Sequence, residues 1–214
     1  MSLDYLFENS QEVWDLSIEH LQLVLVALFF GILVAMPIGI FVARFQKSEI
    51  PILGALGATY AVPSLALLAL LIPWTGIGNT TAIITLAVYS QVFLVRNIVA
   101  GLRGVDDSVL EVARGVGMTR WQVFSKVQMP LAFPVILAGI RIALVTTISL
   151  ATIAAWINAG GLGSLLFNGI ARNNASMILA GTIAVTGLAI LVDQIMRFLE
   201  RWTAIARARR ASNS

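Results

Sequence analysis

Long uncharged runs dominate the pattern of apolar and polar positions along this chain. Residues 50–95 contain no charged side chain, but a cluster of turn-forming residues interrupts them at 73–80. One membrane-crossing helix needs about 20 apolar residues, and clustered Pro, Gly and Asn mark turns. The run therefore predicts two membrane crossings joined by a short turn, rather than one long helix.

The remaining uncharged runs predict three more crossings. Residues 21–42 carry no charge, residues 134–156 carry only Arg141, and residues 173–192 carry none. Backbone exposed to lipid must satisfy its own hydrogen bonds, so each crossing is expected to be a helix. The pattern predicts an all-α, polytopic membrane bundle of about five transmembrane helices. Their expected positions are 21–43, 52–72, 79–100, 134–156 and 176–199, between an N-terminal segment 1–20 and a basic tail 201–214.

Composition agrees with a membrane protein and excludes several functions. The chain is 58% hydrophobic and 12% charged, with a mean hydropathy of +0.90, whereas soluble domains are about a quarter charged. It has no cysteine, which excludes disulfides and thiolate ligands, and its single histidine cannot form a metal site alone. No Walker A pattern for ATP is present. We expect no catalytic site, metal or cofactor in this chain.

The lysines and arginines, which resist translocation, predict the orientation. With five crossings, every basic residue except Arg141 and Arg172 falls on one side, and segment 1–20 carries only acidic charges. We expect the N-terminus outside and the C-terminus in the cytoplasm. The pI of about 9.8 then reflects a basic cytoplasmic face beside anionic lipid, not nucleic-acid binding.

Segment 1–20 does not have the pattern of a cleaved signal peptide, which needs a basic start and a short apolar core. Its apolar residues alternate with acids, which favours a helix lying on the outer membrane surface. His20 is expected at the membrane interface.

The long polar stretch at 104–130 is expected on the cytoplasmic side. Asp107 or Ser108 is expected to cap a first helix that ends near Gly115. Thr119 is expected to cap a second helix over 120–128, which Pro130 stops where the next span begins.

Two aromatic residues, Trp121 and Phe124, recur at helical spacing on this second helix. A short helix with both rings on one side suits docking into a groove of a partner. The alternative is that the two rings only lie at the lipid interface.

An acid, a small residue and a glycine stand at fixed spacing in the same stretch: Glu111, Ala113 and Gly117, followed by Val127-Gln128-Met129-Pro130. This order resembles the EAA motif of permease subunits in bacterial ABC importers, with Val112 in place of the first alanine of the motif. The resemblance implies the type I ABC importer permease fold and a coupling helix that docks on a separate ATPase. The residues implied to couple to the ATPase are Glu111, Ala113, Gly117, Trp121, Phe124 and Pro130.

Further stretches are similar to one branch of these permeases, which takes up osmoprotectants such as glycine betaine, choline and carnitine. They include residues 60–67, 76–78, 134–141, 159–163 and 178–181. The resemblance covers nearly all of residues 21–200. Asn158 stands where the branch usually has glycine, and Phe93 where proline is common. In such systems the aromatic cage for the substrate belongs to a separate extracytoplasmic binding protein.

Uncharged polar residues inside the expected spans are the candidates for a translocation pathway. They are Tyr60, Ser64, Tyr89, Ser90, Gln91 and Asn97. A quaternary ammonium group prefers aromatic faces, but no Tyr and Trp residues are close enough along the sequence to form a cage. The candidates for an outer gate are Asn158, Gly160, Gly161 and Gly163, where glycines favour a tight turn.

Two charges within the expected spans have structural interpretations. Arg141 can extend its side chain to the cytoplasmic interface, and Asp193 can pair with Arg197 one helical turn away.

The resemblance therefore implies a permease subunit of an ATP-driven importer of quaternary-amine osmoprotectants. The alternative is a permease for amino acids of the methionine type. ATP and Mg²⁺ would bind to the partner ATPase. The expected partners are ABC ATPase subunits, an extracytoplasmic substrate-binding protein, a second permease subunit, identical or paralogous, and membrane lipid.

Overall fold

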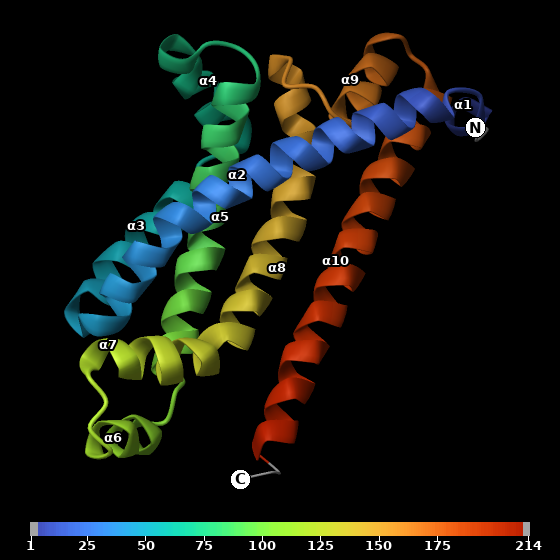
Figure 1. The fold of residues 1–214 in the computed structure, drawn as a ribbon. Coiled ribbons are helices and arrows are strands. Elements are labelled where there is room, and N and C mark those ends of the chain that lie inside the picture. The colour runs from blue at the N-terminus through green and yellow to red at the C-terminus, as the bar shows by residue number, and fades with distance from the viewer. Residues whose placement is uncertain (1–3, 212–214) are drawn as a thin grey trace.

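The computed structural model describes residues 4–211, and no β-strand occurs among them. Four long helices form the body of the molecule (Figure 1): α2 (Ser10–Arg44), α5 (Asn79–Arg103), α8 (Met129–Ala154) and α10 (Ala175–Ala211). The shorter elements are α1 (Asp4–Glu8), η1 (Gln46–Ser48), α3 (Glu49–Ala61), α4 (Ser64–Thr75), α6 (Asp107–Gly115), α7 (Arg120–Gln122), the π-helix η2 (Val123–Gln128), η3 (Ala155–Ile157) and α9 (Gly163–Ala171). The predicted all-α architecture is confirmed.

Close packing of α2 on α5 depends on small residues along one face of α2. Gly31, Ala35 and Gly39 are spaced four residues apart and are buried, so they share a face of the helix. A Cβ at Gly31 would overlap Oγ of Ser90, and a Cβ at Gly39 would lie 2.5 Å from Cγ2 of Ile98. The small residues therefore allow the backbones to approach closely, which is how helices associate in lipid.

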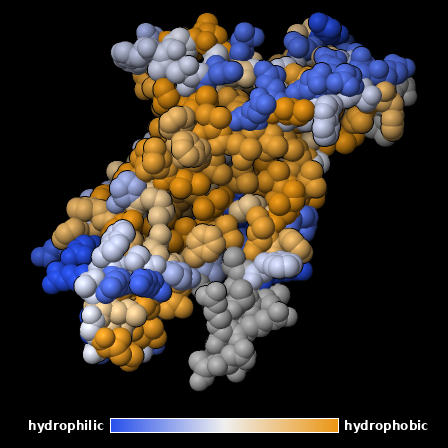
Figure 2. Space-filling model, viewed as in Figure 1, coloured by the Kyte–Doolittle hydropathy of each residue, from blue (hydrophilic) through white to orange (hydrophobic). Residues whose placement is uncertain are grey.

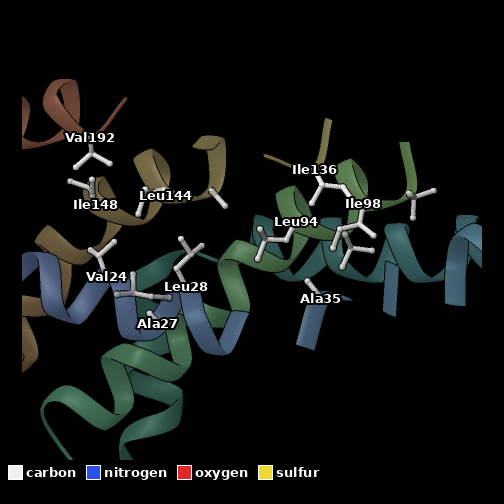
Figure 3. Close-up of a cluster of buried hydrophobic side chains, with 14 of the residues drawn as sticks. Val24, Ala27, Leu28, Ala35, Leu94, Ile98, Ile136, Leu144, Ile148 and Val192 are labelled. Atoms are coloured by element: carbon white, nitrogen blue, oxygen red, sulfur yellow. The ribbon is translucent and has the colours of Figure 1, made fainter. Parts of the chain in front are cut away.

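The N-terminal half of α2 packs against α8 as well. Val24, Ala27 and Leu28 of α2 belong to the same buried cluster as Leu144 and Ile148 of α8, and Figure 3 shows these side chains gathered between the two helices. One continuous core therefore joins α2, α5 and α8.

Helix α2 is longer than a single bilayer crossing. Its 35 residues span about 52 Å at 1.5 Å per residue, against a hydrocarbon core of about 30 Å. Residues 10–20, expected to lie on the membrane surface, are instead the first turns of this helix. Their place on the outer membrane surface stays a prediction, and residues 1–3 lie outside the described part of the chain.

The second expected span, 52–72, is not one uninterrupted helix. It consists of α3 and α4, which meet at a bend of 94°. Val62 has an extended backbone before Pro63, as the steric clash with a following proline favours.

Contacts at the helix ends show that α3 and α4 together cross the bundle once. Arg103, the last residue of α5, donates to the backbone carbonyls of Val42 and Ala43 near the end of α2, and it pairs with Glu49. Helices α2 and α5 therefore end on the same side of the molecule. Because α5 begins on the opposite side, the chain between α2 and α5 must cross. The described residues therefore contain five candidate crossings, the predicted number, with the second one broken.

The surface has the layering expected of a membrane protein. Figure 2 shows apolar residues covering the middle of this face, with polar residues gathered at its two ends. We refer to these ends as the α6 end, which carries α6 and α7, and the α9 end, which carries α1 and α9 (Figure 1).

Candidate coupling and translocation sites

The first helix of the EAA stretch, α6, is capped by Asp106, not by Asp107 or Ser108 as expected. Oδ1 of Asp106 accepts a hydrogen bond from the backbone N–H of Ser108 at 2.9 Å. Hydrogen bonds from Ser108, its side chain first and its backbone N–H second, hold the pKa of Asp106 below its usual value. Ala113 is buried, whereas Glu111 on the same helix is exposed.

Gly117 forms the bend that separates α6 from α7. Its φ of +84° is in the left-handed region, and no atom lies within 4 Å of the position that a Cβ would occupy. Glycine is therefore favoured at this position by its conformation and not by lack of space. The predicted bend at Gly117 is confirmed.

The second helix begins as the sequence predicts. Thr119 and Gln122 form a capping box, in which each side chain accepts from the backbone N–H of the other residue. The ring centroids of Trp121 and Phe124 lie 5.8 Å apart. Trp121 is 71% exposed, and Phe124 packs against the core. The helix therefore projects one aromatic ring away from the bundle while the other anchors it.

Pro130 does not stop this helix, contrary to expectation. Residues 123–128 widen into the π-helix η2, and the N–H of Met129 donates to the carbonyl of Phe124, five residues earlier. The chain then continues without interruption into α8, with Pro130 in its first turn. A proline interrupts a helix because it lacks an N–H and its ring clashes with the preceding turn. Here the wider turn of η2 comes immediately before Pro130, and the helix continues into α8 without a break.

A basic cavity adjoins the projecting helix. It has a volume of about 870 Å³, and its lining includes Arg44 of α2, Arg114 of α6, and Arg120 and Trp121 of α7. Three guanidinium groups at one opening favour an acidic partner surface.

The six pathway candidates separate into groups that face different neighbours. Ser90 and Gln91 are buried against α2, where Nε2 of Gln91 donates to the carbonyl of Gly31 at 3.0 Å. Asn97 lies against α8, and a Cβ at Gly139 would overlap its side chain. In this conformation these three residues contribute to helix packing, and their place in a pathway stays a prediction.

The other pathway candidates meet at the break between α3 and α4. Tyr60 lies near the end of α3, Ser64 begins α4, and the hydroxyl of Tyr89 on α5 donates to the carbonyl of Val62 in the break. The ring of Tyr60 contacts the rings of Tyr89 and Phe93. The structure therefore forms an aromatic cluster that spacing along the sequence did not reveal.

The glycine loop before α9 is held against α2. Gly160 and Gly161 have φ values of +73° and +72°, and Asn158 is also left-handed at 59°. Oε2 of Glu19 accepts from the backbone N–H of Gly161 at 2.9 Å, and a Cβ at Gly160 would overlap the carboxylate of Glu19. The tight turn that the glycines predict is confirmed, but Glu19 carried no sequence signal for this role.

Gly163, the fourth gate candidate, begins α9 and packs against the end of α8. A Cβ at Gly163 would overlap the carbonyl of Thr152. This glycine is therefore required for close approach of the two helices.

His20 is buried, so its expected place at the membrane interface is wrong. Its Nε2 lies 2.9 Å from the carbonyl oxygen of Ile148 on α8. A carbonyl only accepts, so Nε2 carries the proton and donates. Nδ1, which lies against Gly161, has no hydrogen-bond partner among the described residues.

The charges within the spans form an ion-pair network near the α6 end. Arg141 of α8 pairs with Asp193 at 3.0 Å and with Glu200 at 2.8 Å, both on α10. Asp193 also pairs with Arg197 at 2.7 Å, which confirms the predicted i, i+4 pair. Arg141 therefore joins two helices and does not simply extend to the interface.

Comparison with known proteins identifies the class of membrane protein that carries these features. Residues 24–205 match the family described as binding-protein-dependent transport system inner membrane component. The chain belongs to this family. It is a multi-pass membrane protein and the permease component of a transport system.

Two relatives are permeases named for glycine betaine, carnitine or choline. The chain is 38% identical to the glycine betaine/carnitine/choline transport system permease protein OpuCB of Bacillus subtilis, over 93% of this chain and 92% of that protein. It is 42% identical to the carnitine transport permease protein OpuCB of Listeria monocytogenes, over 90% of this chain and 88% of that protein.

Solved structures confirm the fold. An inward-facing conformation of the MetNI methionine ABC transporter superposes with a TM-score of 0.80 at 24% identity, covering 95% of this chain and 99% of that one. An amino acid ABC transporter with histidines gives 0.74 at 18% identity, covering 94% and 98%. The predicted type I importer permease fold is therefore confirmed.

Proposed function

We propose that this chain is the membrane subunit of an ATP-driven importer of quaternary-amine osmoprotectants of the glycine betaine, carnitine and choline type. The observation that carries the proposal is the identity of 38–42% with permeases named for these substrates, extending over at least 90% of the chain. The chain forms the translocation pathway, and hydrolysis of ATP belongs to a separate partner with its own Mg²⁺.

The projecting helix at the α6 end is the proposed docking element for the ATPase. Trp121 offers an exposed ring, and the adjacent cavity offers three arginines. An ATPase that closes on ATP shifts the balance of inward- and outward-facing states only if it contacts them differently. The uninterrupted connection through η2 into α8 transmits that motion to the membrane helices.

The protein lies in the inner membrane of a bacterium. Its α6 end faces the cytoplasm, and its α9 end faces the outside. The arginines of the α6 end support this orientation. An extracytoplasmic binding protein then delivers substrate at the α9 end, beside the glycine loop. A second permease subunit, identical or paralogous, completes the pathway.

The alternative substrate class is amino acids of the methionine type. It rests on likeness to amino-acid importers at 18–24% identity, which supports a shared fold and not a shared substrate.

Uptake by the complete system tests the proposal. The permease is reconstituted in proteoliposomes with its ATPase and binding protein, and uptake of labelled betaine, choline, carnitine and methionine is measured with and without ATP. We expect ATP-dependent uptake of at least one of the three quaternary amines. Uptake of methionine alone would overturn the assignment.

A further inference from the structure

The break between α3 and α4 gathers three aromatic rings beside the middle of α5. The centroid of the Tyr60 ring lies 5.6 Å from that of Tyr89 and 5.2 Å from that of Phe93, with interplanar angles of 70° and 84°. Tyr89 and Phe93 are one turn apart at the middle of α5, so both point to the same side of that helix. The bend in the second span brings Tyr60 onto this side.

The three rings differ in their accessibility. Tyr89 is 4% exposed, and its hydroxyl is bound to the carbonyl of Val62 in the break. Tyr60 is 39% exposed, and Phe93 is half-buried beside it. Tyr89 therefore holds the break in place, while Tyr60 and Phe93 present ring surface to a visiting molecule.

The two segments that carry the rings contain no charged side chain that could attract a cation in place of the rings. The segments that carry the cluster lie within residues 50–95, where the sequence has no acidic or basic side chain. The charges that flank this run are Glu49, which pairs with Arg103, and Arg96, which repels a cation. A cation at the cluster is therefore attracted by the faces of aromatic rings, and this attraction strengthens where water is excluded.

We propose that Tyr60 and Phe93, positioned by Tyr89, form a transient binding site for the quaternary ammonium group of the substrate inside the permease. This inference rests on the proposed function, because it assumes a quaternary-amine substrate. A quaternary nitrogen donates no hydrogen bond, so aromatic faces are suited to recognise it. Rings on one side only make the site weak, as a pathway requires, because a site inside a pathway must also release its substrate.

The test uses the complete transporter in proteoliposomes, with saturating loaded binding protein and labelled choline. Phe93 is replaced by phenylalanines with one, two and three ring fluorines, which keep the shape of the ring and withdraw its electron density. We expect the uptake rate to fall stepwise, reaching about tenfold with three fluorines. Tyr60→Phe should retain the rate within about twofold, and Tyr60→Leu should lose about tenfold.

Phe41→Leu is the matched control, because Phe41 is an exposed aromatic residue of α2 that pairs only with Phe45 among the ring contacts of the described residues. Its uptake should equal that of the unmodified protein. Uptake that is insensitive to fluorination, with normal transport by Tyr60→Leu, would show that the cluster only packs the break. If the unmodified transporter takes up no quaternary amine, the proposed function itself fails, and this site fails with it.

Discussion

Gly117 and Gly160 both have left-handed backbones, but only Gly160 also lacks room for a side chain. The space around Gly117 is open, whereas the carboxylate of Glu19 occupies the position that a Cβ of Gly160 would need. A substitution at Gly117 therefore tests conformation alone, while one at Gly160 tests conformation and space together.

Gly117→Val should abolish uptake while the protein remains in the membrane. A left-handed backbone costs a β-branched residue about 1–2 kcal/mol or more, so the bend changes and the Trp121 helix moves away from the ATPase. Gly117→Asn should retain most uptake, because asparagine tolerates this conformation. The measurement is uptake together with ATPase activity stimulated by loaded binding protein.

Gly115→Val is the control for this prediction, since Gly115 has ordinary helical dihedrals and open space around it. It should transport at close to the unmodified rate. Normal uptake by Gly117→Val would show that this loop is not the coupling element.

Glu19→Ala should loosen the glycine loop at the α9 end. The variant removes the acceptor for the N–H of Gly161, and a partly buried hydrogen bond of this kind contributes roughly 0.5–1.5 kcal/mol. The fraction of time that the loop is open should rise about two- to tenfold. The chain has no cysteine, so the labelling rate of a cysteine introduced at Ala159, which is buried in the closed loop, reports this opening.

Glu19→Gln keeps an acceptor oxygen and should label at close to the rate of the protein with Glu19 intact. Equal labelling rates with Glu19 intact, in Glu19→Ala and in Glu19→Gln would show that Glu19 does not hold the loop.

Residue-scale prediction from the sequence succeeded where the reason was local. Gly117 and Thr119 act on their own turns, and both were identified. Glu19 and His20 act on a loop about 140 residues further along the chain, and a contact at that separation leaves no pattern in either segment. The aromatic cluster was missed for the same reason, since Tyr60 and Tyr89 belong to different helices.

Prolines show why elements are harder to predict than residues. Pro37 and Pro73 lie inside helices, Pro130 lies in the first turn of a helix, and only Pro63 coincides with a break between helices. A proline inside a helix removes one hydrogen bond, and its surroundings decide whether the helix continues. Hydropathy alone therefore predicted the second crossing but not its bend.

Arg141→Met should lower the thermal stability of the purified protein. Arg141 makes two ion pairs between α8 and α10 with side chains that are 20–23% exposed, and removing one partner of a buried pair costs about 3–5 kcal/mol. Partial exposure reduces this to roughly 1–3 kcal/mol, which corresponds to a melting temperature lower by several degrees.

Arg197→Met is the comparison for this prediction. Arg197 is 52% exposed, and an exposed pair at i, i+4 contributes about 0.3–0.5 kcal/mol. Its melting temperature should change by about 1 °C. Equal losses in the two variants would show that the network does not join α10 to α8.

The whole molecule has two ends of different charge, and its topology follows from their contacts. Helices α2 and α5 end together where Arg103 contacts the carbonyls of Val42 and Ala43. Had α3 and α4 formed a re-entrant loop, α5 would begin beside the end of α2 and finish on the opposite side. The sequence predicted the number of crossings and the uneven distribution of basic residues, because both depend only on composition along the chain.

Single-cysteine labelling in intact cells tests this topology, because each introduced cysteine is the only one in the chain. With a membrane-impermeant maleimide, Asn79→Cys and Arg172→Cys should label at once, since both residues are exposed at the turns of the α9 end. Lys47→Cys and Lys126→Cys should label only after permeabilisation, because basic residues stay in the cytoplasm. Labelling of Lys47→Cys and Asn79→Cys from the same side would mean that α3 and α4 do not cross. Labelling of Lys126→Cys from outside would place the proposed ATPase-docking helix where no ATPase can reach it.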